Sequence, residues 1–298
     1  MKKLFLVSMM LTMVMAAQAQ LKVAPQMQKG DQKNYEVTIV TDIPGQGSFT
    51  INEEMAYSVT DATATGYVVK METTKMSSDV KAENIAGQIV AAAQEVMINI
   101  PLLIATDQAG KPLGINNYAE ISKKIDTQSD VLIEKMFKAI PQLSMALPKN
   151  ALKQQILTSL SEEALLKTIQ WSVNPMALNG KTIMTGAQEE YINDQGIKMK
   201  RMYFVNGRNV TVSGSANMSK EELKKLIIEQ VEKMMPEQAD MVKQNIDQLI
   251  ESGMLKLDMK ETGSYEYQED GWVKTIKSEN VTENMGQKVT VNTTVTLK

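Results

Sequence analysis

The sequence predicts an α+β protein with a large antiparallel β-sheet, which we expect to be curved, and with inserted amphipathic helices. Segments of alternating polarity rich in β-branched residues lie at both ends of the chain, and helical periodicity occurs between them. The regular strand–helix alternation of a parallel sheet is absent. Because no Pro-, Gly- or Ser-rich linker divides the chain, we expect residues 20–298 to form a single domain.

The predicted strands form meanders. They span residues 33–43, 47–60, 65–76, 102–106, 111–115, 181–193, 197–215, 256–268, 271–279 and 287–297. Glycine-containing turns separate several of them, as at Asn206-Gly207, because glycine adopts the positive φ of tight hairpins. If the first and last meanders are adjacent, the two ends of the chain share one sheet.

Three stretches are predicted to be helical. Small and apolar residues recur at helical spacing over 82–98, and a helical insertion near 116–171 is interrupted by Pro141 and Pro148. A third helical stretch, near 219–252, should break at Pro236. Ser219 and Glu222 form a capping box at its start, in which each side chain accepts a hydrogen bond from the other residue's backbone N–H.

Composition excludes several function classes. The chain has 298 residues, no cysteine, no histidine and a formal net charge of −3. Nucleic acid needs a basic face, so it is not expected as a partner. Disulfides, thiolate nucleophiles, cysteine zinc sites and most histidine-based mechanisms are excluded as well. We predict no cofactor, no metal site and no catalytic residue.

The N-terminus predicts export. Residues 1–19 have the pattern of a signal peptide, with Lys2 and Lys3 followed by an apolar run and then by Ala17-Gln18-Ala19. We expect cleavage near Ala19/Gln20 and a soluble mature protein in the bacterial periplasm or at the cell surface. The apolar run is shorter than the ~20 residues that span a bilayer, and no later segment is long enough, so no transmembrane span is predicted.

Two short motifs are more simply explained as turns. Ser78-Asp79-Val80-Lys81 matches the Ser-x-x-Lys pattern of a lysine-activated serine, but its companion motifs are missing. Gly180-Lys181-Thr182 matches the end of a phosphate-binding loop, but Pro175 stands where the first glycine is needed. We therefore predict a polar turn at the first and a turn entering a strand at the second.

Acid pairs and methionines were the remaining candidates for a site. Glu53-Glu54 and Glu189-Glu190 should point to opposite faces of their strands, and Glu269-Asp270 lies in a turn, so none is predicted to act as a glycosidase pair. Thioethers suit Cu(I), but the methionines are predicted to fill the core. Met199 and Met202 should face opposite sides of a strand, and Met234 and Met241 should lie on the apolar stripe of a helix.

Two short stretches carry a family resemblance. Gly30-Asp31 with Tyr35, and Gly263-Ser264-Tyr265-Glu266-Tyr267 with Gly271-Trp272, resemble the terminal strands of a domain of unknown function found in exported bacterial proteins. The resemblance implies an exported β-rich fold with inserted helices, and it implies no catalytic residue. The layout of sheet and helices is also similar to the curved sheet of periplasmic lipoprotein carriers.

Three functional hypotheses follow. The leading one is a non-enzymatic exported protein that binds an apolar small molecule, a lipid or an envelope protein on the concave side of the sheet. The second is a structural or assembly factor of the cell envelope that has no small-molecule pocket and acts through a strand edge or helix face. The third is a carboxylate-based hydrolase. The helix that begins at Ser219 either covers the sheet, which we favour, or forms a lid over a cavity.

Overall fold

The computed structural model describes most of the chain after the predicted signal peptide. Its described residues are 19–81, 84–139, 141, 148–171, 173–193, 196–234, 239–252, 257–284 and 287–298. Apart from Ala19, the predicted signal peptide lies outside them, as does the predicted break at Pro236. None of the helices in these ranges is both long enough and apolar enough to cross a membrane.

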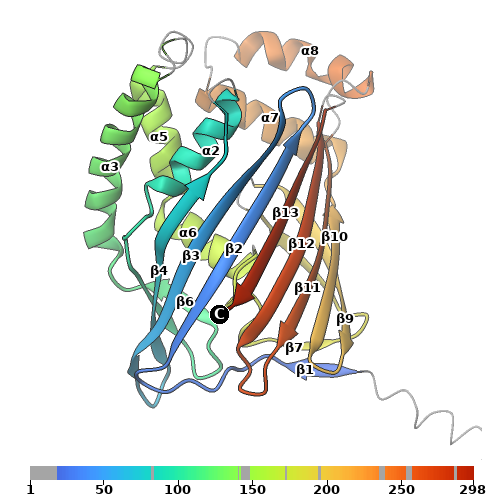
Figure 1. The fold of residues 1–298 in the computed structure, drawn as a ribbon. Helices are drawn as coiled ribbons and strands as arrows, with labels where there is room; N and C mark the ends of the chain where they lie inside the picture. Colours follow the sequence, from blue (N-terminus) through green and yellow to red (C-terminus); the bar gives the residue numbers. More distant parts are fainter. Residues whose placement is uncertain are drawn as a thin grey trace, which may run out of the picture.

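An eleven-stranded antiparallel sheet confirms the predicted α+β class (Figure 1). Its order is β6-β5-β4-β3-β2-β13-β12-β11-β10-β9-β8. The strands of this sheet are β2 (Gln32–Ile43), β3 (Gly47–Ala62), β4 (Tyr67–Ser78), β5 (Leu102–Thr106), β6 (Pro112–Ile115), β8 (Gln188–Ile192), β9 (Lys198–Asn206), β10 (Asn209–Ala216), β11 (Leu257–Tyr267), β12 (Val273–Asn284) and β13 (Gln287–Leu297). Strands that follow one another in the chain pair within this sheet, even where helices lie between them, as with β4 and β5 across α2 and with β10 and β11 across α7 and α8. The chain segment between β6 and β8 connects the two edges of the sheet.

The two ends of the chain meet at the centre of the sheet, as predicted. β13 pairs with β2, with Val295 opposite Val37 and Leu297 opposite Tyr35. Tyr35 is fully buried, and its hydroxyl donates to the carbonyl of Val273 across the junction. The first and last meanders therefore form one continuous surface.

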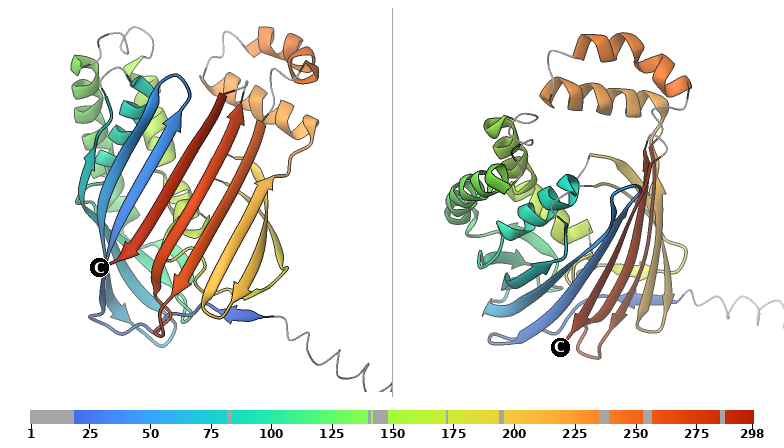
Figure 2. Two further views of the ribbon diagram at one scale, coloured as in Figure 1. Left: turned by 45° about the vertical axis from the view of Figure 1, so that its right-hand side comes forward. Right: turned by 45° about the horizontal axis from the view of Figure 1, so that its top comes forward.

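Alternate residues of each strand face the same side, and we call the side that carries Tyr35 and Tyr57 the inner face. The helices are α2 (Ile85–Glu95), α3 (Tyr118–Ala139), α5 (Lys149–Ser159), α6 (Glu162–Trp171), α7 (Lys220–Met234) and α8 (Ala239–Glu251). The helices α2, α3, α5 and α6 lie beside the half of the sheet made by β2 to β6 (Figures 1 and 2). Their buried residues, such as Ile121, Ile156 and Ile169, join those of the inner face in the main hydrophobic core.

The predicted strand 181–193 is two strands. β7 (Thr182–Met184) pairs with β1 (Gln20–Lys22) in a separate two-stranded sheet, and β8 joins the edge of the main sheet. A turn at Thr185 and Gly186, where φ is +83°, separates them. A polarity pattern of period two continues through such a turn, so the sequence does not reveal the change of partner.

The helical hairpin α7–α8 lies across one end of the sheet rather than on its face (Figure 2). Its capping box is confirmed: the Ser219 N–H donates to Glu222 Oε2 at 2.8 Å, and the Glu222 N–H donates to Ser219 Oγ at 3.2 Å. The expectation that the apolar stripe covers the sheet was wrong in part, because α7 packs mainly against α8. Met241, predicted to be in the core, is 60% exposed, since the stripe of α8 is only partly covered.

Glu53 in β3 makes the stability of the fold depend on pH. Burial raises the pKa of this carboxyl above its usual value. The folded chain therefore binds this proton more tightly than the unfolded chain, in which glutamate titrates near about 4.3. The stability contributed by Glu53 is present below that pH and is lost as the pH rises through the folded-state pKa.

We therefore expect Glu53→Gln to unfold at higher urea concentration than the wild type at pH 7, and we expect the difference to shrink at pH 4. Glu279, exposed on the other face of β12, provides the control, because Glu279→Gln should not gain stability in this way. If Glu279→Gln raised the urea midpoint at pH 7 as much as Glu53→Gln does, this prediction would be wrong.

Candidate functional site

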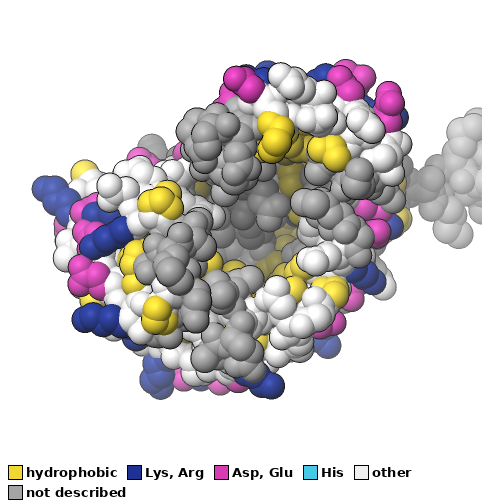
Figure 3. All heavy atoms as spheres, turned by 90° about the horizontal axis from the view of Figure 1, so that it is seen from above, with side chains coloured by type: hydrophobic (Ala, Val, Ile, Leu, Met, Phe, Trp, Pro, Cys, Tyr) yellow, Lys and Arg dark blue, Asp and Glu magenta, His cyan; other side chains and the backbone are white. Residues whose placement is uncertain are grey.

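The half of the inner face made by β9 to β13 is less covered by helices and contains a pocket of about 240 Å³. Apolar walls come from Trp171, Val173, Met199, Val212, Met259, Tyr265 and Val291, and polar side chains from Lys167, Tyr191, Asn193, Arg201, Glu261, Ser278, Asn280 and Thr282. Leu226 of α7 packs against the hydrophobic cluster of Tyr191, Ile197 and Met199, two of which also line the pocket. Seen from the end of the sheet across which α7 and α8 lie, the molecule is hollowed, and hydrophobic side chains border the hollow (Figure 3).

Two glycines on the inner face make room for the pocket and its floor. Gly214 lies between Arg201 and Glu261 in the register of β9, β10 and β11. A Cβ at Gly214 would lie 2.3 Å from Glu261 Oε1, so only glycine lets the two charged side chains meet across β10. A Cβ at Gly263, which lines the pocket, would make only ordinary contacts, of 3.6 Å or more, so a side chain can be placed here without a clash.

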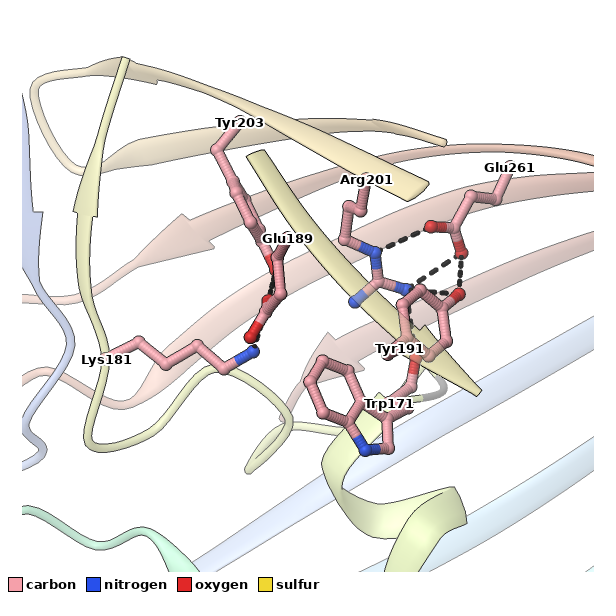
Figure 4. Close-up of polar contacts among 7 residues, drawn as sticks. All are labelled: Trp171, Lys181, Glu189, Tyr191, Arg201, Tyr203 and Glu261. Carbon is pink, nitrogen blue, oxygen red and sulfur yellow. Dashed lines mark hydrogen bonds and ion pairs between the residues drawn. The ribbon is translucent and has the colours of Figure 1, made fainter. Parts of the chain in front are cut away.

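Arg201 and Glu261 form a buried ion pair at the floor of the pocket (Figure 4). The Arg201 Nε donates to Glu261 Oε1 at 2.6 Å and its Nη2 donates to Oε2 at 2.8 Å, while Arg201 is only 3% exposed. Tyr191 Oη donates to Glu261 Oε2 at 2.9 Å, and the carbonyl of Trp171 accepts from Nη2 at 3.0 Å. Such a bidentate pair fixes the geometry of both groups.

The electrostatics of the floor keep the arginine charged and the tyrosine neutral. Burial acts to lower the pKa of Arg201, but the hydrogen bonds and charge of Glu261 outweigh it and raise that pKa. Burial raises the pKa of Tyr191, and the Glu261 carboxylate adds to that rise. Both oxygens of Glu261 already accept hydrogen bonds, so the floor contains no free carboxylate base.

A second polar group lies beside the first. Lys181 Nζ donates to Glu189 Oε2 at 2.8 Å, and Tyr203 Oη donates to the same oxygen at 2.5 Å. Burial lowers the pKa of Lys181, although Glu189 partly offsets this effect. Trp171 joins the two groups, because its ring stacks on Tyr191 with centroids 4.7 Å apart and lies 4.1 Å from Lys181 Nζ. These contacts fix the last turn of α6 against β8 and β9.

Several polar groups at the pocket are still without partners. Arg201 Nη1 is buried and has no hydrogen-bond partner among the described residues. The side chains of Ser278, Asn280 and Thr282 follow one another along the inner face of β12, and none has a partner within the described part of the chain. The three side chains of β12 are partly exposed to the pocket, so they are free to hydrogen-bond to a ligand there.

The turn predicted at Gly180-Lys181-Thr182 is confirmed, and the Ser78-Asp79-Val80-Lys81 motif lies at the end of a strand. Ser78 ends β4 and is exposed, as is Lys81, and residues 79–81 belong to neither helix nor strand. Gly180 closes a turn with φ of +80°, and β7 follows from Thr182. Lys181 from this motif does belong to the polar group beside the pocket, through its ion pair with Glu189 rather than through a phosphate loop.

The predicted separation of the acid pairs also agrees with the structure. Glu189 faces Lys181 and Tyr203 inside, while Glu190 pairs with Lys198 and is exposed. Glu269 is 93% exposed and lies in the turn before β12.

Glu53 is mostly buried, whereas the neighbouring Glu54 pairs with Lys75 at 3.2 Å. Met199 is 2% exposed on the inner face, and Met202 faces the other side; the side chain of Met234 lies outside the description. In the described ranges no three acidic side chains are grouped to hold a metal ion.

Arg201 and Glu261 are not among the residues predicted from the sequence, although the sequence contains a signal for them. Both stand at inner-face positions of strands that otherwise alternate regularly, in Met199-Arg201-Tyr203 and in Met259-Glu261-Gly263. A charged residue at such a position must be paired, and one cation and one anion at matching positions indicate a buried ion pair. No protein-family model matches this chain, and no curated protein matches it in sequence.

Proposed function

We propose that this protein is a non-enzymatic binding protein for an apolar or amphipathic ligand, exported to the periplasm or the cell surface. The ligand would lie on the inner face of β9 to β13, where curvature of the sheet would surround it. The observation that carries the proposal is the pocket over Gly263, in a half of the inner face that the helices beside β2 to β6 leave open.

The composition of the wall supports binding of an amphipathic molecule. Binding sites for small molecules are largely apolar and contain a few well-placed polar groups. Here Met199, Val212 and Met259 form apolar wall, and Ser278 and Asn280 supply polar groups.

The Arg201–Glu261 pair supports binding rather than catalysis, because its hydrogen bonds hold it fixed and leave no free base. The hydrolase hypothesis has less support, since the acid pairs that prompted it are directed apart or lie in an exposed turn.

The arrangement of α7 and α8 favours the hypothesis that α7 forms a lid over a cavity, rather than the hypothesis that it only covers the sheet. The α7–α8 hairpin lies across one end of the sheet, where Leu226 packs against the hydrophobic cluster that contains Met199, and its two helices pack mainly on each other. A helical pair with few contacts to the rest of the fold can move as a unit at low cost.

The first test is a search for a co-purified ligand. The full chain would be produced in a bacterial host with its own N-terminal segment, purified without detergent, and measured by native mass spectrometry before and after organic extraction. We expect an extractable amphiphile at up to one molecule per chain. A ligand-free protein that also fails to bind an apolar fluorescent dye would contradict the proposal.

The second candidate is an assembly factor that acts through strand edges. The edge strands β6 and β8 each carry an exposed large apolar residue, Leu113 at 56% and Ile192 at 54%. An unpaired edge with exposed apolar residues is a template for pairing with another chain. A ligand-free protein that captures a strand-forming partner would support this candidate instead.

A further inference from the structure

The charges that face the pocket are not balanced. Lys167, Arg201 and Glu261 contribute two positive charges and one negative charge. Lys260 also borders the pocket, but it lies at a position of β11 that faces the outer side of the sheet, and its amine pairs with Asp258 at 3.5 Å. Among the described residues Lys167 pairs with Glu163 one helical turn away at 2.7 Å, and Glu163 is 79% exposed, so water screens this pair. The pocket therefore favours an anion.

The free hydrogen-bonding groups favour an acceptor in the ligand. Arg201 Nη1 points away from Glu261 and has no partner among the described residues (Figure 4). Because this atom is buried from solvent, it contributes positive charge below the pocket rather than a direct contact. Ser278 and Asn280 can donate as well as accept, and their side chains are unpaired. Hydrogen bonds from these groups to an ionised oxygen would be stronger than those to a neutral one.

The apolar wall of the pocket favours a ligand that has a hydrocarbon part. Met199, Met259 and Val291 line the same pocket as the polar groups of β12. The pocket volume of about 240 Å³ equals the liquid volume of roughly eight water molecules. That space fits a head group and the first few carbons of a chain, so a longer chain must extend beyond the pocket.

We propose that the pocket binds a single-chain amphiphile with an anionic oxygen head group, a carboxylate or a phosphate ester. The head group lies near Lys167, Arg201 and the polar side chains of β12, and the chain runs along Met199 and Met259. This inference rests on the proposed function and adds the charge and orientation of the ligand to it.

The test compares ligands that share one chain and differ in the head group. Trp171 lines the pocket and Trp272 is 3% exposed, so a Trp272→Phe background reports binding through the fluorescence of Trp171 alone. Decanoate, decyl phosphate, decanol and inorganic phosphate would be titrated below their aggregation concentrations. We expect the two anionic amphiphiles to bind about tenfold more tightly than decanol, since a hydrogen bond to a charged group is worth more than one to a neutral group.

Lys167→Gln separates a charge effect from a general apolar one. This variant should bring the affinity for decanoate close to that for decanol, and added salt should weaken decanoate binding in the unmodified chain. Lys277→Gln is the matched control, because Lys277 is exposed on the outer face of β12, the same strand as Ser278. The control should bind decanoate as the parent does.

The possible outcomes separate this inference from the proposed function. Equal affinity for decanoate and decanol would overturn the anionic head group and leave the binding function in place. Binding of inorganic phosphate alone would overturn the amphiphile in favour of a free anion. Failure of all four probes, together with a ligand-free purified protein, would overturn both.

Discussion

Replacing Glu261 with alanine is expected to lower the free energy of unfolding by about 3–5 kcal/mol, because it leaves the charge of Arg201 buried without a partner. Arg201 is 3% exposed, and Glu261 accepts two hydrogen bonds from its guanidinium and one from Tyr191. Urea unfolding at pH 7, followed by far-UV circular dichroism, measures the change. The affected strands β8 to β11 all contribute residues to the pocket.

The double variant Arg201→Met/Glu261→Met controls for loss of packing. It removes both charges and keeps two long side chains, and such replacements of buried ion pairs are often neutral or stabilising. We expect it to recover most of the stability that Glu261→Ala loses. If Glu261→Ala is as stable as the wild type, Arg201 and Glu261 do not form a buried ion pair. If the double variant is no more stable than the single one, packing rather than charge is responsible.

Replacing Gly263 with valine is expected to abolish most ligand binding without loss of stability. The new Cβ makes contacts of 3.6 Å or more, and its methyl groups enter the pocket. Glycine weakens a strand interior by about 0.5–1 kcal/mol, so the variant should unfold at an equal or slightly higher urea concentration. The amount of co-purified amphiphile per chain, and the titration of Trp171 fluorescence, measure the loss of binding.

Gly114→Val is the matched control for this change. Gly114 lies in the edge strand β6, where a new Cβ meets nothing within 4 Å, at the opposite edge of the sheet from β8. It tests the effect of a strand valine without a change in the pocket, and its ligand content should equal that of the wild type. Undiminished binding in Gly263→Val would place the ligand elsewhere on the molecule.

Local patterns predicted most elements because their causes are local. The Ser219–Glu222 capping box needs only four consecutive residues, and it begins α7 as expected. Glycine in the turns at Gly110 and Gly207 adopts positive φ, as the hairpin chemistry predicts. The element boundaries differ most at 181–193, where the choice between two partner strands is made by residues far away in the sequence.

The candidate site could not be assembled from such patterns, because its parts come from distant segments. Arg201 and Glu261 lie 60 positions apart, and they meet only because β10 places Gly214 between them. The acid pairs in the sequence are adjacent residues, and adjacent residues of a strand point to opposite faces.

The sequence by itself determined the α+β class, the order of most strands and helices, and the absence of cysteine and histidine chemistry; β1 and the division of 181–193 into β7 and β8 were not predicted. Periodicity, capping and turn preference act over a few residues, so they can be identified without the fold. Only the tertiary structure decided that the inner face is open over β9 to β13, that a buried ion pair lies there, and that α7 and α8 lie across the end of the sheet. Those features depend on which strands become neighbours and which helices cover them, and the free energy of these long-range contacts is not encoded in any single segment.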